Sequence, residues 1–81
     1  MHGAKQIGTD REVLGLQPAA KPYEVSVSGA RGLLVRVFPD GARIFEARYT
    51  ALDGKRRRMQ LGVYPSLTLS KARAATGKLR G

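Results

Sequence analysis

The chain has 81 residues, enough for one small domain with a thin core. It has no cysteine and a single histidine, His2, which excludes a disulfide framework and leaves no ligand set for a structural zinc ion. Lysine and arginine total 15 against six acidic residues, and the net charge is +9. A domain this basic favours a polyanionic partner, most often nucleic acid.

The excess charge is confined to one part of the chain. Residues 1–30 carry three cations and three acidic residues, whereas residues 31–81 carry twelve cations and three acidic residues. The longest apolar runs are about five residues, far short of the roughly 20 that a membrane span needs. The start, "MHGAKQ", lacks the apolar region of a secretory signal. We therefore expect a cytoplasmic protein without a membrane partner.

The first predicted element is a short helix in "IGTDREVLGLQP", after a disordered segment at residues 1–8. Thr9 is the expected N-cap, and Glu12, three residues on, completes a capping box. Pro18 ends the helix, because proline cannot continue one.

Four strands are predicted next, separated by turns rich in glycine. "YEVSVSG" alternates apolar and polar residues as a half-buried strand does, and three further stretches follow it. The turns "PDG" and "LDGK" carry residues that favour tight reversals. The expected strands are residues 23–28, 32–38, 42–50 and 56–62.

The last predicted element is a helix in "TLSKARAATGKLRG". Thr68 is its expected N-cap, and Leu69, Ala72 and Ala75 or Thr76 fall on one face. The order of elements indicates an α+β fold: a three- to four-stranded antiparallel sheet with the C-terminal helix on one face and a short N-terminal helix.

Strand alternation then predicts which side chains share a face of the sheet. We expect the apolar sets, such as Phe45 with Ala47, to pack under the C-terminal helix. The opposite face is expected to be open and basic, with Glu46 as its acidic residue and Leu34 as an apolar contact. A bare sheet face needs polar residues in any case, so a single arginine there carries little information.

The whole set of cations carries more information than one arginine, because like charges on neighbouring strands repel one another. Arginine can bond bidentately to guanine or to phosphate, and a sheet can enter the major groove of duplex DNA. Arg57 is expected to point to the other face and Lys55 to sit at the hairpin tip. For groove contacts we predict Arg36, Arg48, Arg56, Arg58 and Gln60. For phosphate contacts we predict Lys55, Arg57 and Arg43.

An ordered set of short motifs runs through the chain. It comprises Lys21-Pro22-Tyr23, Gly32-Leu33, Val35-Arg36-Val37, Phe45, Arg48-Tyr49, Gly54-Lys55, "LGVYP" at 61–65, and Leu69 with Ala72-Arg73. In this set the chain resembles the N-terminal domain of phage and integrative-element integrases, which are tyrosine recombinases. It departs from the pattern in its first turn, at Phe45 where tryptophan is usual, and at Lys71 where an acidic residue is usual.

The resemblance implies that residues 9–81 are a domain that binds double-stranded DNA at arm-type accessory sites, within a longer bacterial integrase. It implies further that catalysis belongs to a core-binding and catalytic part outside this chain. Other integrase protomers and accessory DNA-bending proteins are the further partners it suggests.

Two other functions stay open on the residues alone: a protein-interaction module for recombinase assembly, and an RNA-binding sheet. RNA-binding sheets usually expose aromatic side chains that stack on bases, which this face lacks apart from Phe38. We expect no catalytic site, metal site or cofactor, since no nucleophile–base pair, paired carboxylates or metal-ligand set is present.

Overall fold

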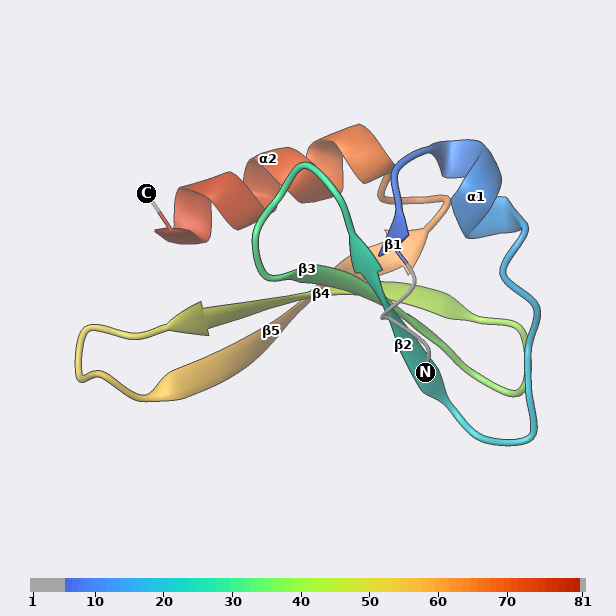
Figure 1. Cartoon of the computed structure of the whole chain (residues 1–81), viewed down its shortest axis with the longest axis horizontal. Coiled ribbons are helices and arrows are strands. Elements are labelled where there is room, and N and C mark those ends of the chain that lie inside the picture. The colour runs from blue at the N-terminus through green and yellow to red at the C-terminus, as the bar shows by residue number, and fades with distance from the viewer. Residues whose placement is uncertain (1–5, 81) are drawn as a thin grey trace.

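The computed structural model describes residues 6–80, except the side chain of Arg80. The elements in chain order are β1 (Gln6–Ile7), α1 (Asp10–Leu14), β2 (Tyr23–Val27), β3 (Leu33–Val37), β4 (Arg43–Thr50), β5 (Arg56–Tyr64) and α2 (Leu69–Arg80). The strands form one sheet in the order β1-β2-β3-β4-β5. Both helices lie on one side of this sheet, and the other side is bare (Figure 1).

The α+β class is confirmed, but the expected three- to four-stranded antiparallel sheet is wrong. The sheet has five strands and is mixed, because β1 pairs in parallel with β2. A parallel pair needs a crossover connection, and α1 with the segment after it supplies one. Two residues are too few to show an alternating pattern, so β1 could not be predicted from the sequence.

The expected disorder over residues 1–8 is therefore wrong at positions 6–8; residues 1–5 lie outside the described part of the chain. Ile7 is buried, and its carbonyl accepts a hydrogen bond from the Ser28 amide at 2.8 Å. The Arg73 guanidinium on α2 donates to the Gly8 carbonyl at 2.9 Å and to the Ser28 carbonyl at 3.0 Å. Arg73, part of the "LSKAR" motif, thus ties α2 to the edge of the sheet.

Both helices begin as predicted. The Thr9 hydroxyl accepts from the Glu12 amide at 3.2 Å, while the Glu12 carboxylate accepts from the Gly8 amide at 2.8 Å. This reciprocal arrangement satisfies amides that the first turn of a helix leaves free. At α2 the Thr68 hydroxyl accepts from the Lys71 amide at 3.4 Å.

The core lies between the sheet and the helices, on the face predicted to hold it. Phe45 is fully buried, and its ring meets that of Tyr64 edge-on at 6.1 Å between centroids. From α2 the inward face is Leu69, Ala72 and Thr76, all buried. Burial and Asp10 raise the pKa of the Tyr64 phenol above its ordinary value of 10.0, against an opposing effect of Arg43.

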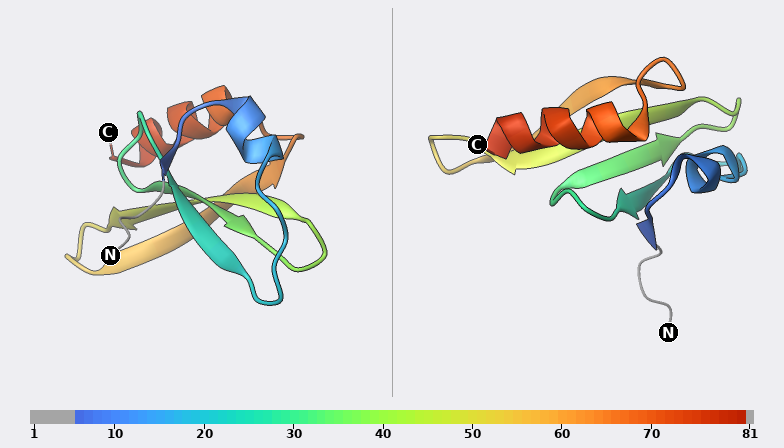
Figure 2. Two further views of the ribbon diagram at one scale, coloured as in Figure 1. Left: turned by 45° about the vertical axis from the view of Figure 1, so that its right-hand side comes forward. Right: turned by 90° about the horizontal axis from the view of Figure 1, so that it is seen from above.

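The β4–β5 hairpin is longer than the part of the sheet that the helices cover. Its tip reaches past the C-terminal end of α2, as Figure 2 shows from above. β5 continues to Tyr64, two residues beyond the expected end, with a bulge in its pairing to β4 at Phe45/Glu46. Near the tip, Arg57 and Met59 are therefore exposed although they point to the helix side.

Candidate nucleic-acid interface

Strand register brings the predicted groove residues onto one surface. Arg36 on β3 pairs with Ile44 on β4, Glu46 pairs with Gln60, Arg48 with Arg58, and Thr50 with Arg56. Paired residues of antiparallel strands point to the same side, so these side chains share the bare side of the sheet. We call this side the open face. Its arginines and glutamine are the predicted Arg36, Arg48, Arg56, Arg58 and Gln60.

Three of these arginines are held by two glutamates. Glu24 on β2 meets Arg48 at 2.5 Å, Arg58 at 2.8 Å and Arg36 at 3.7 Å. Glu46 meets Arg58 at 3.4 Å and Arg36 at 3.7 Å. We call these five side chains the arginine–glutamate network. Its formal charge is only +1, and its guanidinium groups lie over the sheet beside the two carboxylates.

The network corrects the expectation that Glu46 alone balances this face. Glu24 is opposite Arg36 in the β2–β3 register, which the sequence does not specify. Arg48 and Arg58 face each other directly, a repulsive pair, and Glu24 offsets the repulsion by accepting from one with each carboxylate oxygen.

The centre of the open face is sealed beneath the network. Leu34 is 5% exposed and Glu46 6% exposed, so neither presents a broad surface to a ligand. The expected apolar contact at Leu34 is thus mostly covered. Phe38 is partly exposed, and the Arg36 guanidinium carbon lies 5.9 Å from its ring centroid, which is a cation–π distance.

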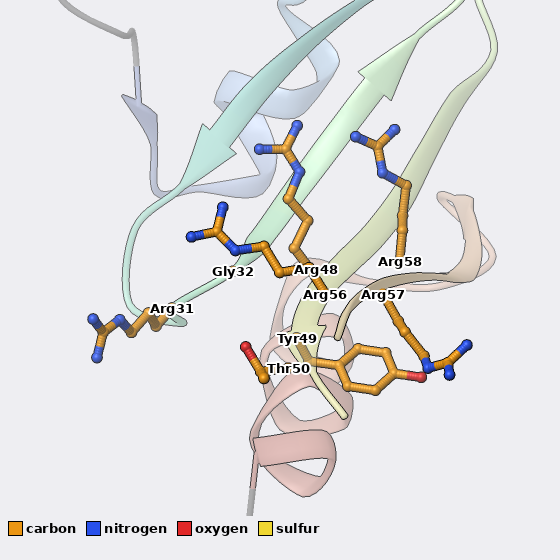
Figure 3. A pocket seen from close by; sticks show the side chains of 8 residues that line it. All are labelled: Arg31, Gly32, Arg48, Tyr49, Thr50, Arg56, Arg57 and Arg58. Atoms are coloured by element: carbon orange, nitrogen blue, oxygen red, sulfur yellow. The ribbon is translucent and has the colours of Figure 1, made fainter. Parts of the chain in front are cut away.

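At the hairpin end the open face leads into a hollow of about 760 Å³ (Figure 3). We call it the sheet-end hollow. Arg48, Arg56 and Arg58 extend over one side of the hairpin and Tyr49 and Arg57 over the other, while the Arg31 side chain, on the turn between β2 and β3, points away from the hairpin. The lining residues are Arg31, Gly32, Arg48, Tyr49, Thr50, Arg56, Arg57 and Arg58.

Charge is less balanced in this hollow than in the network. Among residues 6–79, no carboxylate lies within 4 Å of the guanidinium groups of Arg31 or Arg56. Arg57 pairs with Asp53 at 3.0 Å, and the Lys55 side chain is exposed at the tip. Unpaired arginines are ready to take an anion, because binding costs no existing ion pair.

Arg31 was not predicted as a binding residue, because in the sequence it reads as an ordinary turn residue. The turn is fixed to β4: the Arg48 amide donates to the Gly32 carbonyl at 2.8 Å. Gly32 has φ +87°, and a Cβ added there would lie 2.3 Å from the Arg48 carbonyl oxygen. Gly32, directly after Arg31, was the signal available in the sequence. It permits this close approach and so places Arg31 beside the hollow.

Arg43, predicted for phosphate, has another role. Its guanidinium donates to the Leu14 carbonyl at 3.0 Å and the Leu16 carbonyl at 2.9 Å, on the helix side of the sheet. It holds the end of α1 against β4 and is not part of the open face.

Comparison with known proteins identifies the family of this chain. Residues 6–81 match the Arm DNA-binding domain family. The chain is 38% identical over 66 residues to prophage integrase IntZ of Escherichia coli (strain K12). That alignment covers 80% of this chain and 16% of the integrase, so the chain spans a small part of that relative's length. The resemblance to the N-terminal domain of phage integrases is thereby confirmed, and this chain belongs to the Arm DNA-binding domain family.

Proposed function

We propose that this domain binds double-stranded DNA through the open face, at arm-type accessory sites, as the N-terminal module of a phage integrase. The observation that carries the proposal is the ordered row of guanidinium groups on the bare side of the sheet. It continues at one end into the sheet-end hollow, where two of the five lining arginines, Arg31 and Arg56, have no carboxylate within 4 Å among residues 6–79.

The two regions suit different parts of a duplex. The arginine–glutamate network has donors and acceptors at fixed positions and little net charge, which suits hydrogen bonding to base edges. The sheet-end hollow and the hairpin tip have excess positive charge, which suits phosphate oxygens. We therefore assign Arg36, Arg48, Arg58 and Gln60 to the major groove. Arg31, Lys55, Arg56 and Arg57 are assigned to the DNA backbone, which moves Arg56 from the groove set.

The parent protein's chemistry is part of the same proposal. A longer tyrosine recombinase would cleave and join strands with a separate catalytic domain, while this domain holds distant DNA sites. Bacterial cytoplasm, with the domain on the nucleoid when bound, is the corresponding location. Neither helix among the described residues is long and apolar enough to cross a membrane.

RNA binding is less well supported. Among the described residues of the open face, Phe38 is the one aromatic side chain, and it lies against Arg36 instead of standing free for base stacking.

The test is the double variant R48A/R58A, with K71A/K78A as control. Both remove two positive charges, but Lys71 and Lys78 are exposed on α2, across the sheet from the open face. Duplex affinity is measured by fluorescence anisotropy at several salt concentrations, on a random duplex and on one selected from a randomised pool by the wild-type chain.

We expect R48A/R58A to lose at least tenfold in affinity for the selected duplex, because a good bidentate arginine–base pair contributes about 1–3 kcal/mol. The preference over the random duplex should fall as well. K71A/K78A should keep that preference. Equal effects of the two double variants would refute the open face as the binding surface.

A further inference from the structure

Glu24 is a partly exposed carboxylate that lies among the arginines of the open face, the surface proposed to bind DNA. It contacts three arginines, and its side chain is 25% exposed. An acidic residue here lowers attraction to every phosphate, which is a cost for a domain that only has to bind DNA. Its position therefore calls for a physical explanation.

We propose that Glu24 is a specificity-determining residue: it orients Arg36, Arg48 and Arg58 for base edges and keeps them from binding phosphate indiscriminately. This inference rests on the proposed function and adds the device by which the open face discriminates one duplex from another.

Geometry supports the orienting role. Arg48 and Arg58 are cross-strand neighbours on β4 and β5, whereas Glu24 is two strands away from β4, on β2. Both guanidinium groups reach back across the sheet to the same carboxylate, one to each oxygen. Without it their like charges would drive them apart, toward solvent and phosphate. With it, both are fixed above the sheet before DNA arrives, so less conformational freedom is lost on binding.

Competition supports the filtering role. A phosphate that takes an arginine from Glu24 exchanges one ion pair for another and leaves the carboxylate beside the DNA backbone. A guanidinium has five donors, so either a phosphate or a base edge could accept from an N–H that the carboxylate does not use. A phosphate there is repelled by the nearby carboxylate, whereas a base edge carries no charge and is not. Glu24 thus disfavours phosphate contacts by these three arginines more than it disfavours base contacts.

The second glutamate does not duplicate this role. Glu46 is nearly buried, and the described contacts place it near Arg36 and Arg58 but not Arg48. Arg48 has Glu24 as its carboxylate partner among residues 6–79. Loss of Glu24 should therefore free Arg48 most.

The experiment compares E24Q, E24D and D40N with the wild-type chain, using the selected and random duplexes described above. E24Q removes the charge but keeps the side-chain shape. E24D keeps the charge but withdraws the carboxylate by one methylene. D40N adds the same net charge as E24Q in the β3–β4 turn, outside the network, and retains the side-chain oxygen that accepts from the Ala42 amide.

We expect E24Q to bind the random duplex about eightfold more tightly at 0.1 M salt, which is what one added phosphate contact gives from counterion release. Its salt slope on that duplex should steepen by about 0.9. The ratio of affinities for the selected and random duplexes should fall at least fivefold in E24Q and in E24D. D40N should keep the wild-type ratio.

Different results would refute the arm-site function and the role of Glu24. If the wild-type chain prefers no duplex in the selection, the proposed arm-site function fails. If it does discriminate, but E24Q and E24D keep the wild-type ratio, or D40N lowers it as much, the specificity role of Glu24 is refuted. Thermal melting of each variant is measured alongside, and E24D, with unchanged net charge, decides the matter if E24Q does not fold.

Discussion

The close approach of the β2–β3 turn to β4 gives a stability prediction whose size follows from two glycines. Gly32 and Gly41 both have positive φ, +87° and +93°. A Cβ at Gly32 would lie 2.3 Å from the Arg48 carbonyl oxygen, whereas a Cβ at Gly41 meets nothing within 4 Å. Alanine at Gly41 therefore measures the cost of the backbone conformation alone, and alanine at Gly32 adds the overlap.

The two costs can be estimated separately. An L-residue in the left-handed region costs roughly 1–2 kcal/mol, and replacing glycine returns about 0.4–1 kcal/mol by restricting the unfolded chain. G41A should thus lose about 1 kcal/mol. In G32A the turn must also move away from β4 by about an ångström, and it breaks the Arg48 N–H to Gly32 carbonyl bond, which costs about 1–3 kcal/mol when the groups stay buried. We expect a total loss of about 2–4 kcal/mol.

Urea unfolding followed by circular dichroism measures both values. For a domain of this size, 1 kcal/mol corresponds to about 4–8 °C in melting temperature, so the variants should differ clearly. G32A should also bind duplex DNA more weakly than G41A under conditions where both are folded, because Arg31 loses its place at the sheet-end hollow. Equal destabilisation of the two variants would refute the close approach, and with it the positioning of Arg31.

Other variants test the remaining contacts. R73A should destabilise the fold by about 3 kcal/mol, because two hydrogen bonds from a charged group are lost. Hydrogen exchange should also show lower protection of the Ser28 amide. The control K71A, at an exposed position, should change neither the stability nor this protection. Unchanged protection in R73A would argue against the tie between α2 and β1. Y64F tests pH dependence. The pKa of the Tyr64 phenol is raised above 10.0 in the folded state, so its contribution to stability is present below the unfolded-state pKa. That contribution is lost as pH rises through the folded-state pKa. Wild-type unfolding free energy should therefore fall more steeply than that of Y64F above pH 10, and parallel curves would contradict the burial of the phenol. R31A should reduce duplex affinity and flatten the salt slope by about 0.9, with little change in sequence preference; a loss of preference instead would place Arg31 at bases.

Local patterns were sufficient to predict most of the fold. Strict alternation in "YEVSVSG" and the capping residues Thr9 and Thr68 located β2 and the starts of both helices. The same alternation separated the core face from the open face on β3, β4 and β5, since a period of two leaves only two choices.

What the sequence did not specify was long-range pairing. β1 is two residues long and depends on a parallel partner and on Arg73, neither of which leaves a local pattern. The role of Glu24 depends on the β2–β3 register, and that of Arg43 on where α1 packs. Each involves partners more than ten residues apart in the chain, so composition and spacing alone could not reveal them.

An NMR titration of the ¹⁵N-labelled chain with the selected duplex, at two salt concentrations, tests DNA binding by the open face. We expect amide and arginine side-chain shifts to cluster at residues 31–38, 44–50 and 55–60, with α2 little affected. The shifts at Arg36, Arg48 and Arg58 should persist at the higher salt more than those at Lys55 and Arg56. Shifts spread evenly over every exposed cation, equal on a random duplex and abolished by salt, would contradict binding by the open face.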